Sequence, residues 1–502
     1  MSIAKWITTH AEHDGSRVAI RCDKTVLTYV ALEQRIARWA TTLSGAFGVR
    51  AGDRVALLAP NRAEYLELLF ACSWIGAIFM PLNWRLTANE LSWQLNHAGP
   101  KIVFNDVEFD ELARNAVAEI PNVASRTIDD VALSGVSVAP GAADNDIHRP
   151  LLLVYTSGTT GLPKGAVLSE QALMTVAENG RLAFAMTAHD RVLTTIPMFH
   201  VGGLNIQTLP AMLVGAEVNI ERGFDPGDTL NSIREMRPTL FIAVPTMAQA
   251  LVSHPNFGRT DFSSLRCLCS GSSNVAPEVI TPWHERGVAV TQVYGLTESG
   301  PTATVVPLES AFERSASAGR PASRCEVRVG EGNAPGAPGE IQLRGPGLFS
   351  FYWANEDATR AAFTEDGWFK TGDVGYWDHE GWLYIHDRIN DVVISGGENI
   401  YPAEVEATLL SHPDIAEAAV IGRPDARWGE VPVAFLVLEA GASLDLATVN
   451  QWLTERLARY KHPRDVHIVP PPLPRTSLGK VQKFALREPS LLALGDPDAP
   501  PN

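Results

Sequence analysis

Residues 155–167 read YTSGTTGLPKGAV and directly follow an apolar run, LLLV, at 151–154. A strand that ends in threonine, serine and glycine presents backbone N–H groups and hydroxyls around a small curved space, which suits phosphate oxygens, and Lys164 adds a mobile positive charge. The segment is not a Walker A loop, because Pro163 replaces its second glycine and Gly165 replaces its Mg²⁺-binding Ser or Thr. It predicts a phosphate-binding loop, although such a stretch alone is equally compatible with a flexible surface turn.

Helical and strand-like segments alternate on either side of this loop. Residues 64–74 and 90–97 have helical character, whereas residues 77–81 and 101–105 read as short buried strands. Such alternation predicts an α/β fold with mostly parallel sheets covered by helices. Glycine and proline at 330–339 indicate turns between later β segments. We therefore expect a large N-terminal domain of helix-covered sheets with a β-rich subdomain.

The pattern changes after the sequence DRIND at 387–391. Pro402 is expected at the first position of a helix, with Val405 and Leu409 four apart on one face. Two strands, at 418–422 and 431–439, should follow, and then a helix over 444–460. These segments predict a small, mobile α+β domain over residues 389–502, after an N-terminal domain over residues 1–388.

Charge and cysteine usage limit the classes of function. The 502-residue chain carries a formal net charge of −16, so a nucleic-acid partner is not expected. Its five cysteines are scattered, which argues against a disulfide framework, and Cys267 and Cys269 read as two core residues of one strand. The start of the chain has no signal-peptide core, and the uncharged run at 68–84 is too short to span a membrane. A cytoplasmic protein is expected.

Six further motifs follow the first in order: PMFHVGG (197–203), YGLTE (294–298), TGD (371–373), DRINDVVISGGENI (387–400), WGE (428–430) and PRTSLGK (474–480). Together the seven motifs closely resemble the adenylate-forming superfamily, which comprises acyl- and aryl-CoA synthetases, luciferases and peptide-synthetase adenylation domains. The resemblance covers nearly the whole chain. Residues 65–86 and 394–406 are most similar to feruloyl- and other aryl- or medium-chain acyl-CoA synthetases.

The resemblance implies roles for several side chains, each of which would read as a core or surface residue without its motif. Lys480 would bridge the substrate carboxylate and the α-phosphate, where a compact ammonium can stabilise developing charge. Glu298 would bind Mg²⁺ as a hard oxygen ligand, and Thr297 would place its hydroxyl near the α-phosphate. His200 would border the acyl channel as a lid beside the carboxylate.

The remaining positions are assigned in the same way. The resemblance implies that ATP or AMP is bound by Thr156, Ser157, Gly158, Thr159, Thr160, Gly161, Lys164, Gly271, Ser272, Tyr294, Gly295, Asp373 and Arg388. Coenzyme A contacts fall to Gly396, Gly397, Glu398, Trp428 and Tyr460, and the acyl pocket to His200, Val201, Gly202, Ser299 and Gly300. Asn390 stands at the hinge position, where the family usually has Asp or Lys.

The implied reaction joins a carboxylic acid to ATP, giving acyl-AMP and pyrophosphate, and then transfers the acyl group to coenzyme A. Aryl acids such as hydroxycinnamates are placed slightly ahead of fatty acids. Three alternatives stay open at this point: an enzyme that loads a carrier-protein pantetheine, a luciferase-type oxidising enzyme, and a non-catalytic nucleotide-binding protein. The resemblance also leaves a homodimer open.

Overall fold

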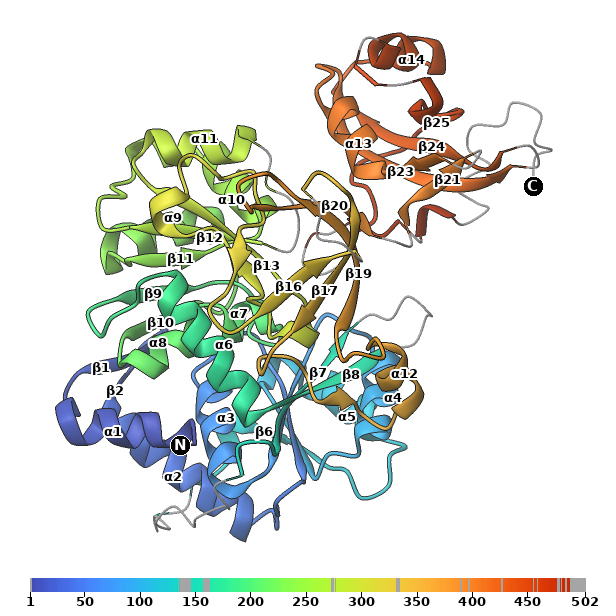
Figure 1. The fold of residues 1–502 in the computed structure, drawn as a ribbon. Helices are drawn as coiled ribbons and strands as arrows, with labels where there is room; N and C mark the ends of the chain where they lie inside the picture. Colours follow the sequence, from blue (N-terminus) through green and yellow to red (C-terminus); the bar gives the residue numbers. More distant parts are fainter. Residues whose placement is uncertain are drawn as a thin grey trace. The chain divides into compact units, whose positions relative to one another are not determined.

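The fold was analysed in a computed structural model (Figure 1). It describes residues 2–133, 135, 146–156, 163–271, 275, 277–330, 335–388, 391–395, 398–425, 428–454, 456–457, 459–475, 479, 481–483 and 485–487. The chain forms two compact bodies. The first contains residues 1–327 and 343–370, and the second contains residues 328–342 and 371–502.

The first body holds two sheets and most of the helices. Its helices are α1 (Ala4–Asp14), α2 (Tyr29–Gly45), α3 (Glu64–Ile75), α4 (Ala88–Ala98), α5 (Asp110–Val117), α6 (Glu170–Ala183), α7 (Val201–Asn205), α8 (Thr208–Val214), α9 (Pro226–Met236), α10 (Pro245–Ser253), α11 (Pro277–Glu285) and α12 (Glu356–Ala361). Two short 3₁₀ helices, η2 (Ile128–Asp130) and η4 (Thr297–Ser299), contain Asp129 and Glu298. None of the helices that the structure describes is both long and apolar enough to cross a membrane.

One sheet of this body has seven strands in the order β18-β8-β7-β4-β3-β5-β6. These are β3 (Arg54–Leu58), β4 (Ile78–Leu82), β5 (Ile102–Asn105), β6 (Ser125–Thr127), β7 (Pro150–Thr156), β8 (Lys164–Ser169) and β18 (Phe351–Tyr352). The strands from β7 to β6 run parallel, and β8 and β18 add antiparallel pairs at one edge. The alternation expected of strands places Met80 and Leu82 among the side chains of α4 and α5, whereas Phe79 packs edge-on against Tyr65 of α3.

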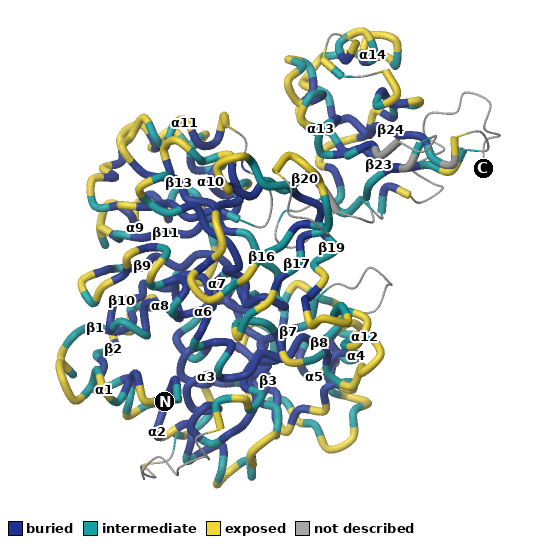
Figure 2. The backbone as a smooth tube through the Cα atoms, in the orientation of Figure 1, coloured by how far each residue is buried: buried dark blue, intermediate teal, exposed yellow. Residues whose placement is uncertain are grey.

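The second sheet has nine strands in the order β15-β14-β13-β12-β11-β9-β10-β1-β2. They are β1 (Val18–Cys22), β2 (Thr25–Thr28), β9 (Arg191–Thr194), β10 (Glu217–Ile220), β11 (Leu240–Ile242), β12 (Cys267–Ser270), β13 (Ala289–Tyr294), β14 (Thr304–Val305) and β15 (Arg320–Pro321). Its central strands are parallel and buried on both faces (Figure 2). Cys267 and Cys269 are fully buried in β12, as their spacing predicted.

A four-stranded sheet, ordered β16-β17-β19-β20, lies largely in the second body and forms the expected β-rich part. It contains β16 (Glu326–Val329), β17 (Gly339–Arg344), β19 (Phe369–Trp377) and β20 (Leu383–Arg388). The C-terminal sheet contains β21 (Val393–Ser395), β22 (Glu398–Ile400), β23 (Ile415–Asp425), β24 (Gly429–Leu438) and β25 (Asp465–Ile468), with helices α13 (Pro402–Leu410) and α14 (Leu446–Thr454).

The C-terminal segment confirms most of the local predictions and corrects one. Pro402 begins α13, and Val405 and Leu409 are both fully buried. The helix expected over 444–460 ends at Thr454 instead. Its apolar spacing continues to Leu457, and the Leu453 carbonyl oxygen accepts from both the Arg456 N–H at 2.9 Å and the Leu457 N–H at 2.8 Å. The apolar pattern therefore outlasts the regular helix by a few residues.

Candidate active site

The phosphate-loop segment begins on a paired strand, as its sequence predicted. Thr156 ends β7 directly opposite Lys164, the first residue of the antiparallel strand β8. The Thr156 hydroxyl lies 3.4 Å from the Lys164 carbonyl oxygen, so both ends of the loop are held together. Residues 157–161 themselves, and Ser272, lie outside the described residues.

Glu298 lies in η4, packed beside β8. It is only 7% exposed, and the Tyr352 hydroxyl donates a 2.7 Å hydrogen bond to its Oε1. The ammonium of Lys164 sits 5.1 Å from the centroid of the same tyrosine ring. Burial, reinforced by the charge of Glu298, raises the pKa of Tyr352 well above its usual value, so the phenol stays protonated and donates. The structure therefore brings together the two charged groups that the sequence assigned to Mg²⁺ and phosphate.

The turn from Tyr294 to Pro301 is too tight for side chains at some positions. An added Cβ at Gly295 would lie 2.0 Å from the carbonyl oxygen of Pro301. The Ser299 hydroxyl accepts a 2.8 Å hydrogen bond from the Leu296 N–H and closes the turn around Thr297 and Glu298. Gly271, after the neighbouring strand β12, is also confined, because its Cβ would approach the Val293 carbonyl oxygen to 2.8 Å. Gly271 and Gly295, two of the glycines proposed from sequence to bind the nucleotide, thus lie at crowded strand ends.

His200 precedes helix α7 in the proposed acyl pocket. Burial, with the nearby positive charge of Arg85, lowers the pKa of His200 to about 4, so its imidazole is neutral at physiological pH. Helix α7 must contain glycine at position 203, where a Cβ would lie 2.5 Å from the Pro197 carbonyl oxygen, whereas a Cβ at Gly202 would meet nothing within 4 Å.

Helix α7 also contacts the turn that carries the other pocket residues. Val201 is buried, and the Asn205 amide lies 3.4 Å from the Gly300 carbonyl oxygen. This contact links the helix to the end of the turn closed by Ser299. The structure thus brings the proposed acyl-pocket segments together.

Asn61 holds the loop before His200 in place. Its Nδ2 donates to the Ile196 carbonyl oxygen at 3.0 Å, and its Oδ1 accepts from the Met198 N–H at 2.7 Å. The side chain is only 2% exposed, so no bulk water replaces these bonds. Asn61 follows β3 of the seven-stranded sheet, whereas Ile196 and Met198 follow β9 of the nine-stranded sheet. One amide therefore fixes the acyl-pocket loop across two sheets.

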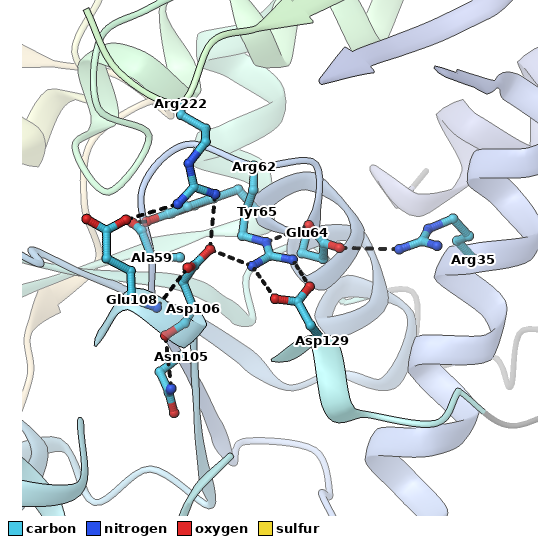
Figure 3. Close-up of polar contacts among 10 residues, drawn as sticks. All are labelled: Arg35, Ala59, Arg62, Glu64, Tyr65, Asn105, Asp106, Glu108, Asp129 and Arg222. Atoms are coloured by element: carbon cyan, nitrogen blue, oxygen red, sulfur yellow. Dashed lines mark hydrogen bonds and ion pairs between the residues drawn. The ribbon is translucent and has the colours of Figure 1, made fainter. Parts of the chain in front are cut away.

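An ion-pair network supports this junction (Figure 3). Arg62 donates to Asp106 at 2.8 Å and to Asp129 at 2.6 Å, and Arg222 reaches the same Asp106 oxygen at 3.2 Å. Burial opposes ionisation of Asp106, but hydrogen bonds from Arg222 and from the Glu108 N–H hold its pKa below the usual value. Because Arg222 follows β10 and Asp106 follows β5, the network also joins the two sheets.

In the second body, Asp373 lies opposite Arg388 in the antiparallel pair of β19 and β20. Asp373 is 6% exposed, and its N–H donates to the Thr371 hydroxyl at 3.1 Å. That hydroxyl in turn donates to the Ile341 carbonyl oxygen at 2.7 Å. The two groups proposed to contact ribose thus share one hairpin.

The proposed coenzyme A residues are only partly described. Trp428 and Tyr460 are exposed on the second body, at 38% and 42%, and Glu398 begins β22. Lys461, next to Tyr460, pairs with Glu404 at 2.6 Å. Gly396 and Gly397, the hinge residue Asn390 and the lysine Lys480 lie outside the described residues, so their roles stay predictions.

Comparison with known proteins decides the family. The family model described as AMP-binding enzyme matches residues 7–353, and the AMP-binding enzyme C-terminal domain matches residues 404–480. The chain belongs to the AMP-binding enzyme family. Its relatives include the indoleacetate–CoA ligase of Aromatoleum aromaticum, which is 42% identical over 97% of this chain and 98% of that protein. The feruloyl-CoA synthase of an Amycolatopsis species is 39% identical over the same shares of both chains.

A solved structure agrees with this family membership. The o-succinylbenzoate coenzyme A synthetase of Bacillus subtilis, in complex with ATP and a magnesium ion, matches with a TM-score of 0.86. It is 34% identical, covering 96% of this chain and 99% of that chain. The AMP-binding fold expected from the seven motifs is therefore confirmed.

Two residues that hold segments of the candidate site in place carried no signal in the sequence. Asn61 stands in an ordinary-looking APNR stretch, and Tyr352 stands in an aromatic FYW run. Each acts on a partner far away in the chain, 135 residues for Asn61 and Ile196 and 54 residues for Tyr352 and Glu298.

Proposed function

We propose that this AMP-binding enzyme is an acid–thiol ligase, which activates an aryl carboxylic acid with Mg-ATP and transfers the acyl group to coenzyme A. One observation carries the proposal: Lys164 and Glu298, a cation for phosphate and a carboxylate for Mg²⁺, contact the same buried side chain beside the glycine/threonine loop. Family membership over both parts of the chain supports the same conclusion.

The residues fit a magnesium ion that arrives with its nucleotide. Mg²⁺ is usually held by one or two carboxylates together with phosphate oxygens and waters, and the buried carboxylate of Glu298 supplies one such ligand. Within the residues that the structure describes, no group of three His, Cys, Asp or Glu side chains could hold a metal by itself. When bound, the ion would neutralise the charge that develops on the phosphates.

The chain's own residues would prepare the first half-reaction. Lys164 would attract the phosphates, and Thr297 would donate to the α-phosphate. The carboxylate of the acid attacks the α-phosphorus, forming the acyl–phosphate bond as the bond to pyrophosphate breaks. Lys480 would stabilise the negative charge on both reacting groups. His200, neutral by its lowered pKa, adds no charge beside the acid.

The second half-reaction would use the second body. The thiolate of coenzyme A attacks the acyl carbonyl, and AMP leaves with the electron pair of the acyl–oxygen bond. Asp373, with Arg388 across the hairpin, would hold the ribose through both steps, since carboxylate oxygens suit vicinal hydroxyls. We place the hinge at Asn390, the mobile domain from residue 389, and the coenzyme A contacts at Trp428 and Tyr460.

The aryl preference rests on the relatives with indoleacetate and feruloyl substrates, together with the small and apolar pocket residues. A cytoplasmic location suits five unpaired cysteines, four of which are buried. The decisive experiment measures thiol-dependent AMP formation with indoleacetate, benzoates, cinnamates and fatty acids of increasing length. Turnover of aryl acids is expected, and absence of acid-dependent pyrophosphate release with every acid would overturn the proposal.

The role of Lys480 can be tested separately. Replacing Lys480 with alanine should abolish adenylate formation, because the ammonium would no longer stabilise the attack on phosphorus. Thioester formation from a supplied acyl-adenylate should continue. Equal loss of both half-reactions would contradict this role.

A further inference from the structure

Tyr352 connects two charged groups that come from separate parts of the chain. Strand β18 pairs with β8 so that Tyr352 lies opposite Ala166, two residues beyond Lys164 on the same face. The ring can therefore reach diagonally to the lysine, whose Nζ lies 5.1 Å from its centroid. Its hydroxyl points to Glu298, 2.7 Å from Oε1. One side chain thus touches both the proposed metal ligand and the proposed phosphate cation.

The chemistry of tyrosine suits both contacts. A phenol donating to a carboxylate makes a charge-assisted hydrogen bond, which is about twice as strong as a neutral one. Glu298 needs such a donor, because a buried carboxylate without a partner is costly. The ring face attracts an ammonium, and it restricts the long, flexible stem of Lys164.

Tyr352 is itself held firmly. Its N–H donates to the Thr359 hydroxyl at 2.9 Å, and its ring packs against Phe349 with centroids 4.7 Å apart. Phe349 in turn donates its N–H to the backbone oxygen of Glu298 at 2.7 Å. Side chain and backbone therefore fix the tyrosine against η4, so movement of the ring would be transmitted to both charged groups.

We infer that Tyr352 is a positioning residue, which sets the orientation of Glu298 and the place of Lys164 before Mg-ATP binds. The inference rests on the proposed function for the role of these two groups. With Oε1 engaged by the phenol, the carboxylate cannot turn freely, and it meets the metal in one orientation. Loss of the hydroxyl should weaken metal binding, whereas loss of the ring should also weaken nucleotide binding.

Two substitutions separate these effects. Tyr352→Phe keeps the ring and removes the hydroxyl, and Tyr352→Leu removes both. The matched control is Tyr29→Phe, at the start of α2. It deletes an equally short 2.7 Å hydrogen bond, which the fully buried phenol of Tyr29 donates to the Ala216 carbonyl oxygen. Thermal unfolding of Tyr352→Phe and Tyr29→Phe compares their loss of stability, so that a general folding defect is recognised.

The readout is metal affinity rather than turnover alone. Mn²⁺ is titrated by electron paramagnetic resonance into protein saturated with a non-hydrolysable ATP analogue. Tyr352→Phe should weaken Mn²⁺ binding about tenfold, the equivalent of one charge-assisted hydrogen bond. Tyr352→Leu should in addition raise the dissociation constant of the analogue. Tyr29→Phe should bind both as the wild type does.

Acid-dependent pyrophosphate exchange provides the second measurement. Tyr352→Phe should shift the Mg²⁺ concentration for half-maximal rate by the same factor and leave the KM of the acid unchanged. In a Glu298→Gln background, Tyr352→Phe should cause no further loss of Mn²⁺ affinity, because the carboxylate that it orients is gone.

Wild-type metal affinity in Tyr352→Phe, or the same weakening in Tyr29→Phe, would overturn the inference. Additive losses in the double variant would do so as well. Failure of the proposed function looks different: the wild type would then show no acid-dependent exchange, while the Mn²⁺ titration would still report on Tyr352.

Discussion

Replacing Asn61 with alanine tests how the acyl-pocket loop is held. The substitution removes two hydrogen bonds, to the Ile196 carbonyl oxygen and from the Met198 N–H, at a site that is 2% exposed. Each buried polar group left without a partner costs about 1–3 kcal/mol. Partial relaxation of the loop should reduce the combined loss of stability to about 3 kcal/mol.

The same change should affect substrate selectively. Met198 is two residues before His200, so a loosened loop must be ordered again whenever the acid binds. We expect the KM of the acid to rise about tenfold, an ordering cost of about 1.4 kcal/mol, with the KM of ATP little changed. Steady-state kinetics with each substrate varied in turn, together with thermal unfolding, measure both effects.

The control is Asn105→Ala. Asn105 is fully buried, and its amide donates to the Asp106 carbonyl oxygen at 3.1 Å and to Asp110 Oδ1 at 3.4 Å, both within five residues of it in the sequence. Asn105→Ala should lower the melting temperature without altering the ratio of the KM of the acid to the KM of ATP. If Asn61→Ala and Asn105→Ala change that ratio equally, the two hydrogen bonds of Asn61 have no specific role in acid binding and the reasoning is wrong.

Three further predictions concern the ion pairs of Asp106, the buried His200 and the proposed ribose ligand Asp373. Arg62→Met should lower the free energy of unfolding by about 3 kcal/mol, because buried Asp106 loses a partner. Arg222→Met should lower it by only about 1 kcal/mol, because the Arg222 side chain is 41% exposed. Urea unfolding measures both losses. His200 has a folded pKa of about 4, below its unfolded value, so the unfolded chain takes up the proton first and the free energy of unfolding falls as pH drops from about 6.5 toward 4. The free energy of unfolding of His200→Phe should depend less on pH across this range than that of the wild type. Equal slopes would contradict the lowered pKa. Asp373→Ala should raise the KM of ATP at least about tenfold with little change in the KM of the acid, since the ribose loses its acceptor, and an unchanged KM of ATP would remove Asp373 from the ribose site.

Local features of the fold could be predicted from the sequence because they depend on nearby residues. The strand at β5 follows from a short apolar run, and the start of α13 follows from Pro402. The length of α14 could not be predicted in this way, since the apolar spacing continues through Leu457 although the helix ends at Thr454. Helix ends depend on single hydrogen bonds that periodicity does not report.

The candidate site divides in a similar way. Glu298 and Lys164 could be proposed as site residues because they stand in motifs, and the structure adds that both contact the side chain of Tyr352. Tyr352 and Asn61 could not be identified, because their function depends on contacts made across different strands and sheets. The structural role of such residues depends on tertiary packing, for which a single sequence contains no local pattern.

The contrast between two adjacent glycines bears on attempts to engineer the enzyme for other acids. Position 203 tolerates no larger residue, because its backbone nearly touches that of Pro197. Position 202 has free space around it, so mutagenesis libraries that aim to shorten or reshape the proposed acyl pocket should vary residue 202 and leave residues 203 and 295 unchanged.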